Sequence, residues 1–263
     1  MLVDMSILWP ALLAGLLVLS THVPLGQVVL KRGIIFIDIA VAQMAGMGVI
    51  AAEYFGWEAN GWTVQIAAGL AALSGAVVFN LCEKYWPDVL EALIGIGFVL
   101  ASSGSILMLA GNPQGGEHLK DMLVGQILWV GSDALLHTAV LYVVLLTCWF
   151  VLRERIGRIG FYVLFALAVT ASVQLVGVYL VFASLIVPAL AVRSCSECLK
   201  LPLAYATGIA GYVAGLLLSF AFDLPTGAIT VWSLVGAGLV VSLFGTRKRK
   251  CQETNAKESS MSS

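Results

Sequence analysis

Seven polar side chains interrupt the long apolar stretches of this chain, and their types suit chemistry inside a membrane. They are His22, Asp38, Gln43, Glu53, Glu91, His137 and Gln174. A charged group at the centre of a bilayer costs roughly 2.5–3.5 kcal/mol on insertion scales, so such residues usually face a bundle interior or a polar path. His, Asp and Glu side chains also bind divalent metals, and zinc usually takes four ligands. A route for such an ion would need several of these side chains to converge from different helices.

Asp38 lies about one turn into its apolar segment, and Gln43 follows five residues later. Five residues turn a helix through about 500°, so the two side chains are offset by about 140° and need not line one face. Met44 and Met47 come next and carry soft thioether sulfurs, although packing is the commoner role of such residues. Asp38 could also cap the start of a helix and meet the positive end of its dipole. Both roles of Asp38 stay open.

His22 precedes Pro24 within an apolar segment. It is either a neutral, hydrogen-bonded histidine at a proline kink or a metal ligand. Glu91 stands at the start of another apolar segment, which predicts a first-turn acid favoured by the helix dipole. Cys195 and Cys198 have the spacing of half a zinc site, but a second pair of ligands is missing, which favours two ordinary cysteines.

Several classes of protein are excluded by what the chain lacks. It has no phosphate-binding loop of the Gly-x-x-x-x-Gly-Lys-Ser/Thr type, so any ATPase that drives it must be another chain. It has no Gly-x-Ser-x-Gly element and no evident nucleophile–base pair within its spans. An intramembrane enzyme is therefore the weakest interpretation, and no catalytic residue and no cofactor bound to this chain are expected.

The composition indicates a helical membrane protein that crosses the bilayer many times. The 263 residues are 60% hydrophobic and 11% charged, against roughly 25% charged residues in a soluble domain. Apolar runs near twenty residues recur along the whole chain, and that length crosses about 30 Å of hydrocarbon. The first run is expected to be a retained span, because no basic region precedes it as it would in a signal peptide.

Nine apolar segments follow one another along the chain. Their approximate bounds are 7–30, 35–55, 62–82, 89–110, 134–152, 160–176, 177–192, 203–222 and 228–245. The sixth and seventh are short and meet at Gly177, so they could instead be one broken helix with a re-entrant piece, which would leave eight crossings. The interval 111–133, with Glu117, His118 and Asp121, is expected to form an outer interfacial helix. We predict a permease domain at 1–246 and a disordered cytoplasmic tail at 247–263.

The positions of Lys and Arg predict the orientation of these segments, because cytoplasmic loops are enriched in both. Nine alternating segments with a cytoplasmic C-terminus place the N-terminus outside. The cytoplasmic loops are then 31–33, 82–88, 153–158 and 193–200, and Lys120 is the only basic residue on the opposite side. We refer to residues 193–200 as the shelf. This polar piece separates two apolar segments and is expected in the cytoplasm, where a partner could push on it.

Five stretches resemble the membrane permeases of bacterial ABC importers for zinc, manganese and iron, the ABC-3 type. Residues 176–193 are similar to the family's Val-Gly-x-x-Leu-Val-x-x-Leu-Ile-x-Pro-Ala-x-x-Ala-Arg stretch before its coupling helix. The other four are 31–48, 91–95 (Glu-Ala-Leu-Ile-Gly), 123–128 (Leu-Val-Gly-Gln-Ile-Leu) and 223–227 (Asp-Leu-Pro-Thr-Gly). The five occur in the family's order, and the predicted topology agrees with it.

One departure from the family pattern concerns the ion route. The family has Gly-Asp-Ala-Leu-Ser-His, whose Asp and His line the route. This chain places Asp38 one position early, with Ala42 where Ser is usual and Gln43 where His is usual. The resemblance then implies a tentative metal set of Asp38, Gln43 and His22, with Gln43 as a weak oxygen ligand and His22 as a substitute. The change is also compatible with a different ion or a chelated one.

The resemblance implies an all-α polytopic membrane protein with 8–9 transmembrane helices, similar to a type II ABC importer permease, in the bacterial inner membrane. Its cargo would be a divalent metal, zinc first. Its partners would be an ATP-binding cassette subunit, which binds ATP, an extracytoplasmic metal-binding protein and a second permease copy, with no nucleic acid. The residues implied in coupling to the ATPase are Pro188, Arg193, Ser194, Glu197 and Lys200. The alternative is an ion-coupled secondary carrier that works without an ATPase.

Overall fold

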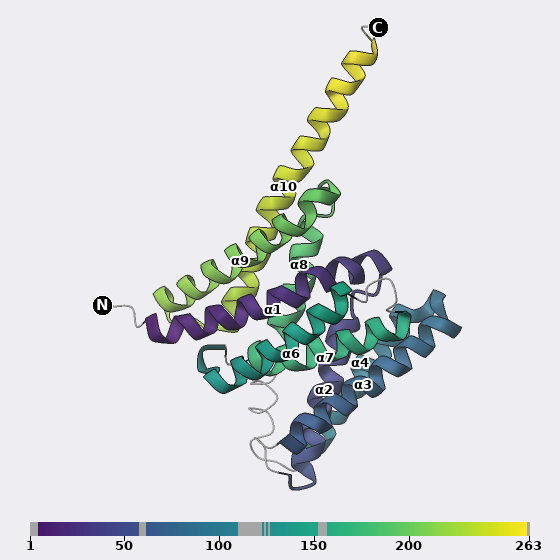
Figure 1. Cartoon of the computed structure of the whole chain (residues 1–263), viewed down its shortest axis with the longest axis vertical. Coiled ribbons are helices and arrows are strands. Elements are labelled where there is room, and N and C mark those ends of the chain that lie inside the picture. The colour runs from purple at the N-terminus through teal and green to yellow at the C-terminus, as the bar shows by residue number, and fades with distance from the viewer. Residues whose placement is uncertain are drawn as a thin grey trace.

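The computed structural model is a bundle of α-helices, and the residues that it describes form no strand (Figure 1). It describes the backbone of residues 5–57, 62–109, 123, 125, 127–151 and 157–261, and the side chains of these ranges from residue 8 to residue 243. The helices are α1 (Met5–Arg32), α2 (Ile37–Tyr54), α3 (Trp62–Tyr85), α4 (Leu90–Leu109), α6 (Ser132–Val151), α7 (Arg158–Val176), α8 (Val178–Ala191), α9 (Glu197–Phe222) and α10 (Thr226–Met261), with short 3₁₀ helices η1 (Pro87–Val89) and η2 (Ile127–Trp129).

The apolar segments predicted from the sequence become helices with nearly the same bounds. Within the described ranges, eight helices are long and apolar enough to cross a membrane. A helix satisfies its own backbone hydrogen bonds, which lipid cannot do, so a helical bundle is the expected solution for such a chain. The remaining helix, α8, has 14 residues and would span only about 21 Å at 1.5 Å per residue. The chain is therefore a multi-pass helical membrane protein.

Gly177 separates α7 from α8 and is the point at which the sixth and seventh apolar segments meet. Its φ of +81° lies in the left-handed region, which a glycine adopts without strain. Gly125, at φ +72°, packs against the same junction, and a Cβ on Gly125 would lie 2.6 Å from the Gly177 nitrogen. Gly125 therefore fits against the α7–α8 junction only because it carries no side chain.

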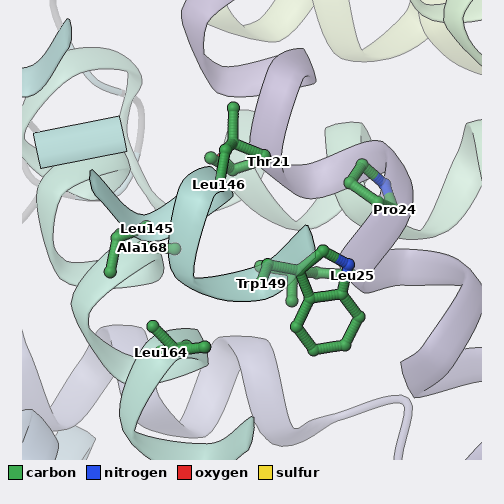
Figure 2. A pocket seen from close by; sticks show the side chains of 8 residues that line it. All are labelled: Thr21, Pro24, Leu25, Leu145, Leu146, Trp149, Leu164 and Ala168. Atoms are coloured by element: carbon green, nitrogen blue, oxygen red, sulfur yellow. The ribbon is translucent and has the colours of Figure 1, made fainter. Parts of the chain in front are cut away.

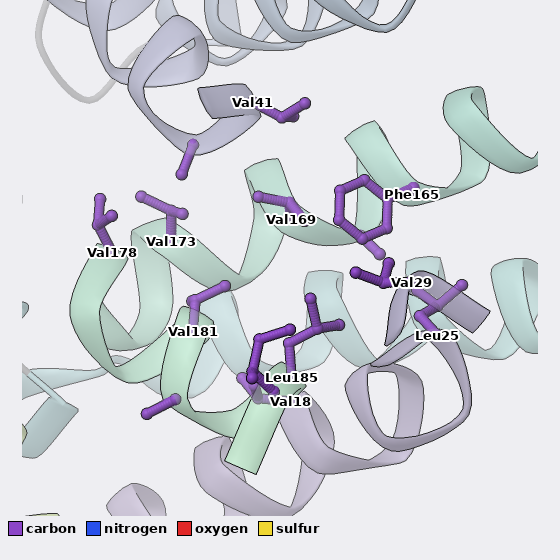
Figure 3. Close-up of a cluster of buried hydrophobic side chains, with 14 of the residues drawn as sticks. Val18, Leu25, Val29, Val41, Phe165, Val169, Val173, Val178, Val181 and Leu185 are labelled. Atoms are coloured by element: carbon purple, nitrogen blue, oxygen red, sulfur yellow. The ribbon is translucent and has the colours of Figure 1, made fainter. Parts of the chain in front are cut away.

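The core of the bundle lies between α1, α2, α7 and α8 (Figure 3). Ten of the buried apolar side chains that meet there are Val18, Leu25, Val29, Val41, Phe165, Val169, Val173, Val178, Val181 and Leu185. The most apolar windows of α1, α2 and α7 are each 61% buried, whereas that of α6 is only 11% buried. Peripheral helices such as α6 thus present apolar side chains outward, as a lipid environment requires, while α2 is enclosed on most sides.

α9 and α10 pack closely along one side of the bundle through glycines. A Cβ on Gly211 would lie 2.7 Å from the Leu234 Cα, and one on Gly215 would lie 2.5 Å from the Thr230 Cα. Small residues at such crossings let two membrane helices approach until their backbones are in van der Waals contact. Asp223, at φ +51°, ends α9 and starts the short turn that leads into α10.

Three local expectations differ from the structure. The shelf is not a separate element, because α9 begins at Glu197 and continues through Pro202 into its span. Of the expected interfacial helix, residues 127–129 form a single 3₁₀ turn whose Ile127 is buried in the core, while Glu117, His118 and Asp121 lie outside the described residues. α10 continues to Met261 through the segment predicted to be disordered, which contains three Lys, two Arg and two Glu residues, all good helix formers.

Candidate functional site

Asp38 is the second residue of α2, and its side chain is fully buried. Neither of its carboxylate oxygens has a hydrogen-bond partner among the described residues. It therefore does not cap the helix through a side-chain hydrogen bond, which was the structural alternative for this residue. A buried carboxylate without a partner is costly, and in membrane proteins such groups mark binding sites and pathways.

His22 is fully buried on α1, and both of its ring nitrogens are engaged. Nδ1 lies 3.0 Å from the Val18 carbonyl oxygen and 3.0 Å from the Thr21 hydroxyl, while Nε2 lies 3.1 Å from the Ser172 hydroxyl on α7. A carbonyl oxygen only accepts, so Nδ1 carries the proton and donates it to Val18. Nε2 is then unprotonated, and its lone pair faces the Ser172 hydroxyl. Metal-binding histidines are oriented in the same way, by a backbone carbonyl on the other ring nitrogen.

Tyr142 of α6 connects these two groups. Its hydroxyl donates to the Ala168 carbonyl of α7 at 3.1 Å and is fully buried. The same hydroxyl interacts with the Ser172 and Thr21 side chains and lies within electrostatic range of Asp38. We call Thr21, His22, Tyr142 and Ser172 the polar cluster. Asp38 on α2 and His22 on α1 are thus both buried in the bundle interior, but among the described residues Asp38 makes no hydrogen bond to the polar cluster.

Gln43 is also buried on α2, with 2% of its surface exposed, and its Oε1 has no hydrogen-bond partner among the described residues. Because α2 is enclosed on most sides, the burial of both Asp38 and Gln43 does not require them to share a face. No group of three or more His, Cys, Asp and Glu residues in the described ranges is close enough to hold a metal ion. The described residues therefore contain no closed, high-affinity metal site built from such groups.

The other polar candidates in the spans do not join this region. His137 is exposed and packs edge-on against Trp62, with ring centroids 5.6 Å apart, and Gln174 is exposed on α7. Met44 and Met47 serve packing, as expected. The Met44 sulfur fills the space over Gly75 between α2 and α3, and the Met47 sulfur lies 3.1 Å from the position of a Cβ on Gly104.

A small pocket adjoins the polar cluster between α1, α6 and α7 (Figure 2). Its empty volume is about 260 Å³, and its lining is Thr21, Pro24, Leu25, Leu145, Leu146, Trp149, Leu164 and Ala168. Only Thr21 among these belongs to the polar cluster. The lining is otherwise apolar, so it offers no ligand for an ion, and the pocket lies beside the polar region without extending it.

The hydrogen bond between His22 and Ser172 joins α1 to α7 in the bundle interior, and its removal should be measurable. We expect Ser172→Ala to reduce stability by about 0.6–1.7 kcal/mol, the range of interhelical hydrogen bonds in a membrane protein. Ser103→Ala is the matched control, because the Ser103 hydroxyl donates to Val99 of its own helix at 2.7 Å and is exposed. Thermal unfolding in detergent measures both, and an equal change in the two variants would contradict the role of Ser172.

The shelf presents mostly exposed side chains between α8 and the start of α9. Arg193, Glu197 and Leu199 are exposed, and Ser194 and Lys200 are partly buried. The Lys200 ammonium is 2.6 Å from a Glu197 carboxylate oxygen, and Lys31 of α1 lies within electrostatic range of Glu197. Pro188, by contrast, is buried inside α8, so it cannot touch a partner directly and instead shapes the helix that leads to the shelf.

Sequence reasoning missed Tyr142, Thr21 and Ser172 of the polar cluster, and with them a second buried pair. In that pair, the Ser184 hydroxyl on α8 lies 2.9 Å from the Tyr212 hydroxyl on α9. The available signal was a hydroxyl group inside an apolar run. That signal is weak, because a Ser or Thr hydroxyl can bond to its own helix, as the Ser103 hydroxyl does.

Comparisons with known proteins agree with this architecture. The chain is 30% identical over 154 residues to a probable iron transport system membrane protein of Haemophilus influenzae, a match that spans 51% of this chain and only 56% of that relative. Its fold is similar to PsaBC from Streptococcus pneumoniae in complex with Fab, with a TM-score of 0.73, 20% identity and coverage of 90% and 91% of the two chains. It is also similar to an inward-facing ABC transporter described as of metal-chelate type, with a TM-score of 0.60, 19% identity and coverage of 92% and 88%.

The family match is the most extensive of these findings. The model of the ABC 3 transport family matches residues 4–159 and 151–245, which together include nearly all of the apolar segments. Because this match covers far more than half of the sequence, the chain belongs to the ABC 3 transport family, as a membrane-spanning transport subunit rather than an enzyme.

Proposed function

We propose that the chain is the permease subunit of an ATP-driven importer of divalent metal ions, with zinc as the first expected cargo and manganese or iron next. The observation that carries the proposal is the Asp38 carboxylate, which is fully buried and has no hydrogen-bond partner among the described residues. A stable protein retains such a costly group where it has a use, and a passing cation would supply the missing charge. The iron transport name of the relative from Haemophilus influenzae supports a metal cargo.

Along its route the ion would meet several weak ligands, one after another. Asp38 would supply charge, His22 would supply its Nε2 lone pair after releasing Ser172, and the free Gln43 oxygen would add a neutral ligand. Oxygen and imidazole ligands suit zinc, manganese and ferrous iron. A set of only two or three protein ligands, with none of them fixed to a bound ion, would release its cargo readily, which a transport route requires.

The chain would reside in the inner membrane of a bacterial cell. The ATPase would bind the shelf from the cytoplasmic side of that membrane. Exposed Arg193, Glu197 and Leu199 offer charge and apolar surface to such a partner. The shelf continues directly into α9 and follows α8, so a push there would reach the core between α1 and α8. Two permease copies, two ATPase subunits and an extracytoplasmic metal-binding protein would complete the importer.

Reconstitution tests this function. The chain would be placed in proteoliposomes with its ATP-binding partner and its extracytoplasmic metal-binding protein, and the uptake of radioactive Zn²⁺, Mn²⁺ and Fe²⁺ would be followed with and without ATP. We expect uptake that requires both ATP and the partner. Uptake by the isolated chain, driven by an ion gradient, would instead support a secondary carrier and would contradict the proposal.

Reversal of one charge on the shelf should weaken binding of the ATPase without lowering the thermal stability of the chain. We expect Arg193→Glu to lower the amount of ATPase that co-purifies with the chain about tenfold, because a like charge facing an interface disfavours binding by a kcal/mol or more, and about 1.4 kcal/mol is tenfold. Lys84→Glu is the matched control at the predicted cytoplasmic end of α3, outside the shelf. The thermal midpoint of both variants should stay that of the unaltered chain. Equal ATPase recovery from the two would exclude Arg193 from the contact.

A further inference from the structure

Glu91 of α4 makes a hydrogen bond to the backbone that links α1 to α2. Its Oε1 accepts from the Phe36 backbone N–H at 3.1 Å, across 55 positions of the sequence. Its second carboxylate oxygen is buried and has no hydrogen-bond partner in the described part of the chain. The Glu91 side chain thus contacts the backbone of another segment. A favourable interaction with the dipole of its own helix, α4, does not explain this contact.

This contact supplies something that α2 lacks. Phe36 occupies the N-cap position of α2, and no side chain of its own segment caps the helix. The first N–H groups of a helix have no partner within that helix and need one elsewhere. A carboxylate at this end is further stabilised by the positive end of the helix dipole. Glu91 therefore acts as a cap for α2 that is provided by a neighbouring helix.

The opposite side of the same link is held by an aromatic contact. The Phe36 ring stacks on Phe182 of α8, with ring centroids 6.5 Å apart and an interplanar angle of 1°. The N-terminus of α2 is thus clamped between α4, through Glu91, and α8, through Phe182. Asp38 lies two residues after Phe36, so the clamp sets where the first turn of α2, and with it the Asp38 carboxylate, stands in the bundle.

We infer that Glu91 is the positioning residue for Asp38, holding the start of α2 through the Phe36 amide so that the buried carboxylate faces the ion route. This inference rests on the proposed function, since it assigns a role in a metal site. Glu91 is not expected to touch the ion. Its acceptor oxygen matters rather than its charge, so a side chain that keeps the oxygen should preserve the site.

Kinetics of uptake can separate this role from a general structural one. In proteoliposomes with the ATP-binding partner, we expect Glu91→Ala to raise the KM for Zn²⁺ about tenfold and to leave the maximal rate unchanged within about twofold, whereas Glu91→Gln, which keeps an accepting oxygen, stays near the unaltered chain. Asp88→Ala is the matched control, because Asp88 is exposed in η1 just before α4. Mn²⁺ and Fe²⁺ would be assayed alongside.

Hydrogen exchange gives a second readout at the site itself. We expect Glu91→Ala to accelerate exchange of the backbone amides at residues 36–40 several-fold, with other helices unchanged. Phe182→Leu, which removes the stack from the other side, should raise the KM in the same direction and keeps the test available if Glu91→Ala does not fold. An unchanged KM and unchanged exchange, or a fall in maximal rate and thermal midpoint without a KM change, would overturn the inference.

The two proposals fail in different ways. If the unaltered chain with its partner takes up none of the three ions, the proposed function is wrong, whatever Glu91 does. If the unaltered chain transports metal and the Glu91→Ala variant has the same KM and the same amide exchange as the unaltered chain, the proposed function stands. Only the role of Glu91 is then wrong.

Discussion

Asp38→Asn is expected to reduce metal uptake at least about tenfold while leaving the protein as stable as before or more stable. The loss follows from removal of a carboxylate that could bind a cation in the bundle interior, and even indirect changes at metal sites cost about 10–100-fold in affinity. The stability follows because the Asp38 oxygens have no hydrogen-bond partner among the described residues, so the substitution loses no contact seen there and replaces a carboxylate that is costly to bury in its ionised form.

ATP-dependent uptake and the thermal midpoint in detergent measure these two effects on the same preparation. Asp133→Asn is the matched control, since Asp133 is an exposed first-turn acid of α6. Unchanged uptake in Asp38→Asn would remove Asp38 from the route. A large fall in the thermal midpoint would instead indicate that the carboxylate has a structural role that its contacts do not reveal.

Gly26→Ala is expected to destabilise the bundle by about 3 kcal/mol, at the upper end of the cost of overpacking. A Cβ at this position of α1 would fall on the backbone carbonyl of Leu185 in α8, with the carbonyl carbon 3.0 Å away. A backbone group cannot rotate aside as a side chain can, so the two helices would have to separate. This contact joins the helix that carries His22 to the helix that leads to the shelf.

Gly69→Ala tests the same substitution where space is available, because a Cβ on Gly69 in α3 would meet nothing within 4 Å. There the change should be neutral or stabilising by up to about 1 kcal/mol, since alanine favours helix more than glycine does. The fraction of monodisperse protein recovered in detergent and its thermal midpoint compare the two. Similar values for both variants would show that α1 and α8 are farther apart than the structure places them.

The helices were the most predictable part of the fold. The expected segment 62–82 became α3 (Trp62–Tyr85), and 160–176 became α7 (Arg158–Val176). Lipid imposes this regularity, because an apolar run of sufficient length satisfies its backbone only as a helix. The break at Gly177 was also visible in advance, but the left-handed backbone at Gly177 and the approach of Gly125 from a distant segment were not.

The candidate site was less predictable. Asp38, Gln43 and His22 are buried and Pro188 is enclosed in α8, but the roles of the first three in a metal route and of Pro188 in coupling to the ATPase stay predictions. Hydropathy does not distinguish a polar group that faces the interior from one that faces outward, and His137 and Gln174 belong to the outward class. The hydroxyl of Tyr142 gave only a weak signal in an apolar run.

Composition, apolar run length and motif order were enough to define a multi-pass helical transport subunit and to single out Asp38. The free-energy cost of exposing apolar surface to water, or of burying a carboxylate, depends on residue type, which the sequence shows directly. The packing of the helices decided three contacts that the sequence did not show. It paired His22 with Ser172, it left Asp38 without a hydrogen-bond partner among the described residues, and it brought Glu91 to the Phe36 amide. Such contacts depend on the rotation and approach of helices distant in sequence, which local hydropathy does not encode.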